Sequence, residues 1–182
     1  MRRGTSAGPA RALKNVSLVA LDVDGVMTDG KIIINDDGVE SKNFNVRDGM
    51  AIVLALEYGL QIAVISGRNS KVVERRAREL KIRHVYQGAR DKKRVFKDLL
   101  AKLKLRPSQA AFMGDDINDI EAMEYAGFSA APADADPAVI RAAAWTSKFP
   151  GGGGAVRELI RLVMVARGIW PRHDGKAYPT EA

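Results

Sequence analysis

Short apolar runs alternate with amphipathic segments along most of the chain. The apolar runs suit strands and cover residues 18–21, 60–65, 83–87, 110–113, 128–131 and 144–146. Helical patterns cover residues 48–56, 70–80, 91–103, 116–126 and 155–166, with a shorter one from residue 137. The expected N-terminal caps of the first three are Asp48, Asn69 or Ser70, and Asp91. Strands and helices that alternate in this way predict an α/β fold with a doubly wound parallel sheet.

The segment between the first strand and the first helix predicts a β-hairpin over residues 31–44. Asp37 and Gly38 form a favourable turn dipeptide between its two β-capable halves. Ile32 and Ile34 share one face of the hairpin and Ile33 lies on the other. A small hairpin that is apolar on both faces needs a cover, and the alternative is a hairpin folded on its own core. No later segment is long enough to form a separate cap domain.

The two ends of the chain differ from the region between them. Residues 1–15 are small, polar and basic without the apolar core of a secretory signal, so we expect a disordered basic arm. Residues 16–168 are expected to form one domain with a sizeable core, and residues 169–182 a flexible tail. The four glycines at 151–154 predict a flexible joint before the last helix.

The composition excludes several classes of metal site and points to oxygen ligands. Cysteine is absent, so the chain has neither disulfides nor thiolate metal sites. Two histidines in the whole chain do not favour a catalytic zinc site. Ligands drawn from oxygen atoms alone favour Mg²⁺.

Charge and hydropathy bear on the partners of the chain. No stretch approaches the ~20 apolar residues of a membrane span, so we expect no membrane association. The formal net charge is +7, and we interpret it as a solvated surface, with a small anionic ligand as the alternative. Aromatic residues make up only 6% of the chain and form no RNA-binding pattern, so nucleic acid is not an expected partner.

Polar side chains follow four of the predicted strands. They are Asp22 and Asp24, then Ser66, Gly67 and Arg68, then Lys92 and Lys93, and finally Asp115 and Asp116 with Asp119. Ligands of open α/β sheets bind outside the carboxyl ends of the strands, so these groups should meet at one edge. Asp22 and Asp24 point to the same side and repel each other unless a cation lies between them. The alternative is that both belong to an ordinary polar turn.

The four motifs resemble those of the haloacid dehalogenase (HAD) superfamily of phosphotransferases. In order they are Asp22-Val-Asp24-Gly25-Val, Ser66-Gly67, Lys92 and Gly114-Asp115-Asp116-Ile-Asn-Asp119, and the likeness covers roughly residues 17–167. The segment 22–30, together with Val46-Arg47-Asp48-Gly49 and Ser66-Gly67-Arg68, resembles one capless branch, the 3-deoxy-D-manno-octulosonate 8-phosphate phosphatases. In that branch a hairpin replaces the cap domain, which implies a HAD-like Rossmannoid fold and a homotetramer.

The resemblance also implies the roles of the acidic residues. Asp22 would be the nucleophile that forms an aspartyl-phosphate, and Asp24 would be the general acid and base, which requires a raised pKa. Asp22, the backbone carbonyl of Asp24 and Asp115 would bind Mg²⁺. Asp116 and Asp119 would not bind the metal themselves but would contact the residues that do. The alternative for Asp119 is an exposed position on a helix.

The resemblance assigns the phosphate and the rest of the substrate to other residues. The Ser66-Gly67 pair would hold the phosphoryl group, with the Ser66 hydroxyl as a donor, and Lys92 would neutralise it and hold the nucleophile. Arg68 would face the mouth of the site and bind a carboxylate. Arg76 matches a basic position of the branch and of the sialic-type group, and Arg47, in the loop after the hairpin, is a further candidate for substrate contact. For each arginine the alternative is a surface salt bridge, and the glycine run lacks the arginine that often interrupts it in the branch.

Together these features predict a cytoplasmic Mg²⁺-dependent phosphatase of sugar-acid phosphates. The expected substrate is 3-deoxy-D-manno-octulosonate 8-phosphate, on the path to lipopolysaccharide. One alternative is a sialic-type 9-phosphate, against which Arg68 argues because that group often has glutamate there. Another is a non-catalytic HAD-like subunit, against which the full set of catalytic side chains argues.

Overall fold

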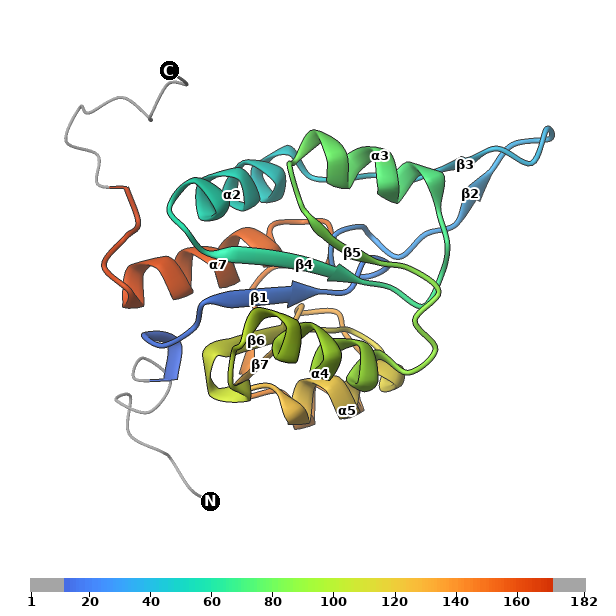
Figure 1. Cartoon of the computed structure of the whole chain (residues 1–182). Helices are drawn as coiled ribbons and strands as arrows, with labels where there is room; N and C mark the ends of the chain where they lie inside the picture. The colour runs from blue at the N-terminus through green and yellow to red at the C-terminus, as the bar shows by residue number, and fades with distance from the viewer. Residues whose placement is uncertain (1–11, 172–182) are drawn as a thin grey trace.

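A six-stranded parallel sheet forms the centre of the computed structural model, which describes residues 12–171 (Figure 1). Its strands are β1 (Leu18–Leu21), β4 (Gln61–Ile65), β5 (His84–Tyr86), β6 (Ala110–Met113), β7 (Phe128–Ala131) and β8 (Trp145–Thr146). The strand order is β5-β4-β1-β6-β7-β8 and every neighbouring pair is parallel, which confirms the predicted fold class. The winding direction changes between β1 and β6, where α/β folds of this kind bind ligands.

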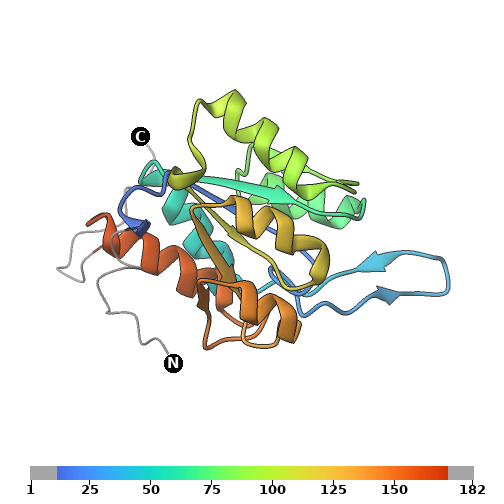
Figure 2. The ribbon, with the colours of Figure 1, turned by 90° about the horizontal axis from the view of Figure 1, so that it is seen from below.

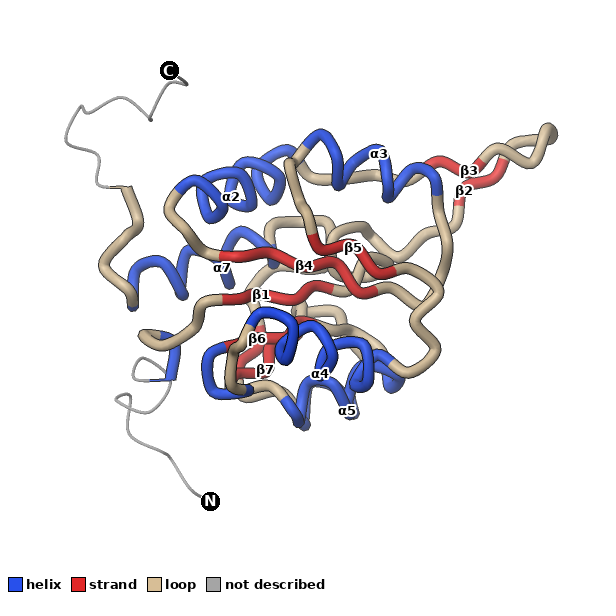
Figure 3. Tube along the Cα trace, in the orientation of Figure 1, coloured by secondary structure: helices blue, strands red, loops and turns tan. Residues whose placement is uncertain are grey.

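Helices cover both faces of the sheet (Figure 3). One face carries α2 (Val46–Glu57), α3 (Lys71–Glu79) and α7 (Ala155–Ala166), and the other carries α4 (Lys92–Leu103), α5 (Ile120–Tyr125) and α6 (Pro137–Ala142). Two 3₁₀ turns, η1 (Pro107–Gln109) and η2 (Ile117–Asp119), flank β6. Successive residues of β1 are buried alternately in the two cores, as the period of a strand requires. This double cover explains why β1 is apolar throughout.

The helix caps agree with the sequence in two cases and differ in one. Ser70 and Asp91 cap α3 and α4, since their side chains accept hydrogen bonds from the first-turn amides. The predicted cap at Asp48 is wrong, because α2 begins two residues earlier and Asn45 accepts from the Arg47 amide at 2.8 Å. Oδ1 of Asp48 instead accepts from the backbone N–H of Arg157 at 2.8 Å. Asp48 therefore caps α7, the helix that packs beside α2.

The predicted hairpin is present and projects from the body of the molecule (Figure 2). Its paired strands are short, β2 (Ile33–Ile34) and β3 (Glu40–Ser41), and Gly38 turns the chain with φ +74°. Ile32 and Ile34 are 58% and 59% exposed, so the hairpin does not fold on a core of its own within the described residues.

The glycine run is packed rather than a free joint. Gly151 is buried, and a Cβ atom on it would lie 1.8 Å from the carbonyl oxygen of Gly25. The Gly152 amide donates to the Val26 carbonyl at 3.0 Å. The expectation of a flexible joint is therefore wrong, because close backbone contact, not mobility, requires glycine here. The run supports the loop that follows β1.

Parts of both expected terminal segments lie within the described residues. Leu13, from the expected arm, is 1% exposed and belongs to the core. Ile169 and Trp170, from the expected tail, pack partly against the same core. The remainder of both predictions, residues 1–11 and 172–182, lies outside the described residues. Between residues 12 and 171, no helix combines the length and apolar character that crossing a membrane requires.

Candidate active site

Three predicted residues meet at the switch point between β1 and β6. Asp22 follows β1, and its amide donates to the Met113 carbonyl of β6 at 3.0 Å. The Lys92 ammonium, from the first turn of α4, donates to Asp22 Oδ1 at 2.8 Å and to Asp119 Oδ1 at 2.6 Å. All three side chains are buried, so the lysine lies between two carboxylates with little water to screen them.

Asp119 organises the loop after β6. Its Oδ2 accepts the backbone N–H groups of Asp115 at 3.2 Å and Asp116 at 3.3 Å. A Cβ atom on Gly114 would lie 2.3 Å from the Asp119 Cβ, so this approach requires glycine. Asp119 is fully buried, which makes the alternative of an exposed helix position wrong. The exposed Asp116 caps η2 by accepting the Ile117 amide at 2.7 Å.

The carboxylates of Asp22, Asp115 and Asp119 can offer oxygens that lie within 4.8 Å of one another. Oδ1 of Asp115 is buried without a hydrogen-bond partner, whereas both oxygens of Asp119 are already bonded. A buried carboxylate oxygen without a donor is costly unless a cation compensates it. Asp22 and Asp115 therefore fit a hard cation such as Mg²⁺, which takes oxygen ligands. A Cβ atom on Gly25, which has φ +88°, would lie 2.0 Å from Asp115 Oδ2 and block the site.

Burial and mutual repulsion dominate the electrostatics of this cluster. Burial, with repulsion from Asp119, raises the pKa of Asp22 to about 6 although Lys92 opposes the shift. Burial, with repulsion from Asp22 and Asp119, raises the pKa of Asp115 to about 8. Burial alone would lower the pKa of the Lys92 ammonium, but the two carboxylates outweigh it and the pKa is raised. The cluster therefore holds excess negative charge that a cation would relieve.

Ser66 lies buried at the end of β4. Its backbone N–H donates to the Tyr86 carbonyl at 2.9 Å, and its carbonyl accepts the Ala89 amide at 3.0 Å. Its hydroxyl oxygen accepts the Arg68 amide at 3.3 Å. Because a hydroxyl also carries one hydrogen, Ser66 remains able to donate to a bound phosphoryl group.

A cavity of about 320 Å³ connects these groups to solvent. It is lined by Asp22, Asp24, Gly30, Ile32, Ser66, Gly67, Arg68, Lys92, Asp115, Asp116 and Asn118. The structure thus brings eight predicted residues to one cavity, where the strand-end argument places them. Gly30, Ile32 and Asn118 were not predicted. Asn118 lies inside the fourth motif, so its position in that motif was the available signal.

Two further residues that the sequence did not single out lie at the root of the hairpin. The Lys42 ammonium donates to Asp24 Oδ1 at 2.5 Å and pairs with Glu40 Oε1 at 3.3 Å. Glu40 also accepts from Nη2 of Arg68 at 3.0 Å and from the hydroxyl of Ser70. The Ser70 hydrogen bond is the largest cause of a lowered pKa at Glu40, with Lys42 and Arg68 adding to it. The available signal was the two-residue spacing of Glu40 and Lys42, which places both on one face of the strand.

Arg47 and Arg76 lie outside this cavity. The Arg76 guanidinium lies 5.8 Å from the Phe44 ring centroid and pairs with Glu79 at 3.2 Å. Its Nη2 would be 2.3 Å from a Cβ atom on Gly49, so Arg76 packs against α2. Arg47 is exposed and lines separate hollows near the start of α2. Within one chain, the structure does not join these two arginines to the predicted phosphate site.

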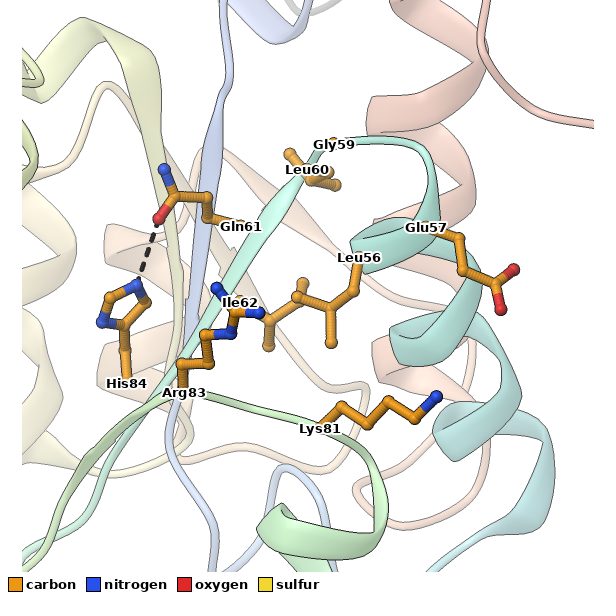
Figure 4. A pocket seen from close by; sticks show the side chains of 9 residues that line it. All are labelled: Leu56, Glu57, Gly59, Leu60, Gln61, Ile62, Lys81, Arg83 and His84. Carbon is orange, nitrogen blue, oxygen red and sulfur yellow. Dashed lines mark hydrogen bonds between the residues drawn. The ribbon is translucent and has the colours of Figure 1, made fainter. Parts of the chain in front are cut away.

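A larger cavity, of about 540 Å³, opens at the opposite edge of the sheet (Figure 4). It lies by Gln61 and His84, at the starts of β4 and β5, where the His84 ring Nε2 is 3.1 Å from Gln61 Oε1. None of the predicted site residues lines it. Position relative to the strand ends, rather than size, therefore selects the smaller cavity as the active site.

Comparisons with known proteins agree with this geometry. The family model for the haloacid dehalogenase-like hydrolases matches residues 34–127. The chain is 44% identical over 178 residues to the 3-deoxy-D-manno-octulosonate 8-phosphate phosphatase KdsC of Escherichia coli (strain K12), covering 95% of each chain. A crystal structure of the same phosphatase from Yersinia pestis aligns with TM-score 0.89 at 40% identity, over 91% of this chain and 89% of that one.

A second solved structure carries ligands. The 3-deoxy-D-manno-octulosonate 8-phosphate phosphatase from Moraxella catarrhalis, in complex with a magnesium ion, a phosphate ion and a KDO molecule, aligns with TM-score 0.88. The identity is 36%, and the alignment covers 90% of this chain and 94% of that one.

Proposed function

The chain belongs to the haloacid dehalogenase-like hydrolases and, among them, to the 3-deoxy-D-manno-octulosonate 8-phosphate phosphatases, and we propose that it hydrolyses this sugar-acid phosphate with Mg²⁺. The products are 3-deoxy-D-manno-octulosonate and inorganic phosphate. The observation that carries the proposal is the buried Asp22–Lys92–Asp119 arrangement beside the unpartnered Asp115 oxygen. The identity to relatives of that activity over nearly the whole chain supports the substrate.

Hydrolysis proceeds by two displacements at phosphorus. The Asp22 carboxylate attacks the phosphorus atom, the bond from phosphorus to the sugar oxygen breaks, and Asp24 gives that oxygen a proton. A water molecule then attacks the aspartyl-phosphate, Asp24 accepts its proton, and the Asp22 carboxylate is released with phosphate. Asp24 thus returns to its starting state after each turnover.

Charge on the phosphoryl group is neutralised from several directions. Asp22, Asp115 and the backbone carbonyl of Asp24 would hold Mg²⁺, which would supply a divalent positive charge next to the phosphoryl group. Lys92 holds the nucleophile and adds a positive charge from α4, while Ser66 and the Gly67 backbone contribute hydrogen-bond donors after β4. Asp119 keeps Lys92 and the loop of Asp115 in place.

Substrate choice is proposed to depend on Arg68. Its side chain is 42% exposed and lies at the mouth of the cavity, 3.9 Å from Asp24 and 3.0 Å from Glu40. A planar guanidinium at that place suits the carboxylate of a sugar acid. Arg47 and Arg76 do not line the cavity, so we propose no substrate contact for them within one chain.

We also propose that the protein is a cytoplasmic homotetramer. The support for assembly is the projecting hairpin, whose Ile32, Ile34 and Val39 side chains are each nearly three-fifths exposed. Apolar side chains gathered on one small projection favour burial against another copy of the chain. Light scattering coupled to size exclusion tests the tetramer, and a monomer would contradict it. Cell fractionation tests the location.

The deciding experiment measures phosphate release from 3-deoxy-D-manno-octulosonate 8-phosphate with and without Mg²⁺. A sialic-type 9-phosphate serves as the competing substrate and Asp22→Asn as the inactive control. We expect Mg²⁺-dependent turnover of the first substrate by the wild type alone. Faster turnover of the 9-phosphate would contradict the proposed substrate. Activity of Asp22→Asn equal to that of the wild type would contradict the proposed mechanism. No turnover of any phosphate by folded protein would favour the non-catalytic alternative.

A further inference from the structure

We infer that Lys42 is a positioning residue, which orients the carboxyl group of Asp24 so that this group can give its proton to the leaving alcohol, and that Glu40 holds Lys42 in place. The inference rests on the proposed function in taking Asp24 as the acid and base. On this inference the root of the hairpin, Glu40 and Lys42, contributes to catalysis, whereas its tip is proposed to take part in assembly.

The burial of Lys42 is the first observation. Its side chain is 0% exposed, although most of the residues between 29 and 50 are exposed. Fixing a lysine costs conformational entropy, and removing an ammonium from water costs more unless other groups replace its hydration. Asp24 at 2.5 Å and Glu40 at 3.3 Å provide that replacement. Lys42 is therefore held between two carboxylates rather than left in solvent.

The two oxygens of Asp24 differ in their contacts. Oδ1 accepts from Lys42, whereas Oδ2 has only the Nε of Arg68 at 3.9 Å, too far for a hydrogen bond. The side-chain torsion that rotates an aspartate carboxylate is broad, so a contact must select its orientation. With Oδ1 held by Lys42, Oδ2 is the oxygen left to exchange a proton with the substrate. Asp24 lines the cavity, where that exchange would take place.

Glu40 connects this contact to the rest of the fold. Its Oε1 accepts from Arg68 at 3.0 Å, and its Oε2 accepts from the hydroxyl of Ser70, the cap of α3. The Ser70–Glu40–Lys42 series thus runs from a helix end to Asp24. The hairpin has only two paired residues on each strand, so these contacts of Glu40 help to hold its base against the body of the molecule.

The leaving group makes the inference testable. A sugar alkoxide is a poor leaving group and needs a proton, whereas p-nitrophenolate departs without one. The ratio kcat/KM reports binding and the steps up to release of the alcohol, so it excludes the later hydrolysis of the aspartyl-phosphate. Because Glu40 also contacts Arg68, an unchanged KM for the sugar phosphate is needed to assign the loss to proton transfer rather than to binding. For Lys42→Met we expect kcat/KM on the sugar phosphate to fall about 100-fold, within the range of general-acid contributions, and kcat/KM on p-nitrophenyl phosphate to fall less than about threefold.

Three further variants separate positioning from general disruption. Lys31→Met removes an exposed lysine of the same hairpin and should leave both substrates unaffected. Lys42→Arg keeps a cation and should recover part of the loss on the sugar phosphate. Glu40→Gln should lower the same substrate's kcat/KM selectively, but less than Lys42→Met. Light scattering on each variant establishes that the oligomeric state is unchanged.

Equal losses on both substrates, or no loss on either, would overturn the inference. These outcomes concern only the variants. The proposed function is tested separately, by the activity of the wild type on the two sugar phosphates. If the wild type prefers another alkyl phosphate, that compound replaces the sugar phosphate in the comparison, and the same selective loss is expected.

Discussion

The Lys92 ammonium lies 2.8 Å from Oδ1 of Asp22, and both side chains are almost completely buried. The contact joins the end of the central strand to the start of α4 across 70 residues of sequence. Asp119, 2.6 Å from the same ammonium, makes the lysine common to two carboxylates. A single cation thus stabilises the nucleophile and the loop that carries the second metal ligand.

Loss of that cation should damage both activity and stability. In Lys92→Met we expect kcat to fall more than about 100-fold, because the phosphoryl group loses a charge partner. We also expect the free energy of unfolding, measured in urea, to fall by about 3 kcal/mol, because Asp22 and Asp119 are left buried and unpaired.

Adding Asp119→Asn to Lys92→Met should recover part of the stability but none of the activity, since it removes one of the two repelling carboxylates. Lys93→Met, at an exposed neighbouring position, is the control and should match the wild type. A fully stable Lys92→Met protein would contradict the account of the buried cluster.

Metal-free protein should become less stable as the pH rises from about 4 to 8. The pKa of Asp115 rises from its usual 3.8 to about 8 and that of Asp22 to about 6, so over this range the folded state binds protons that the unfolded chain has lost. The unfolding free energy therefore decreases with pH. Melting temperatures measured in a chelator at several pH values test this decrease. In Asp115→Asn the melting temperature should fall less steeply with pH.

Mg²⁺ should stabilise the protein more at pH 8 than at pH 6. Its carboxylate ligands must be deprotonated, and protons compete with the metal until the pH approaches the raised pKa of Asp115. Melting temperatures at fixed Mg²⁺ and several pH values measure the effect. A larger Mg²⁺ response at pH 6, or an undiminished response in Asp115→Asn, would show that the metal is held elsewhere.

Gly25→Ala should abolish the Mg²⁺ response. The added Cβ would lie 2.0 Å from Asp115 Oδ2 and displace that carboxylate. Gly38→Ala is the matched control, because Gly38 also has a positive φ but nothing within 4 Å of its Cβ position. The control should lose only the backbone strain of about 1–2 kcal/mol and bind Mg²⁺ normally. Calorimetric titration with Mg²⁺ distinguishes the two.

Asp48→Ala should lower the unfolding free energy by about 1 kcal/mol, the usual effect of removing a helix cap. Asp48→Asn should cost less than Asp48→Ala, since its amide oxygen can still accept the Arg157 N–H. Urea titrations of both variants measure the difference. Equal destabilisation by alanine and asparagine would contradict the capping role.

The sequence was sufficient for features that depend on local pattern. The strands, most helices and the convergence of Asp22, Ser66, Lys92 and Asp115 follow from hydrophobic periodicity and from the geometry of parallel sheets.

The features that were missed depend on contacts between distant segments. Asp48 caps α7 only because α7 packs on α2, and Lys42 reaches Asp24 only because the hairpin returns to the site. Arg76 lies on the helix that follows Ser66-Gly67-Arg68, yet its guanidinium packs against Phe44 and Gly49 instead. Sequence spacing alone cannot specify which neighbour a long side chain meets.

The packing of Gly151 under Gly25 has a consequence for the order in which the protein matures. The loop that carries Asp24 leaves the ribosome early, but the backbone that supports it is among the last parts of the domain to be synthesised. A nascent chain that ends before Gly151 can form most of the sheet without a completed site. Catalytic competence should therefore arise only near the end of translation, when the final helix docks.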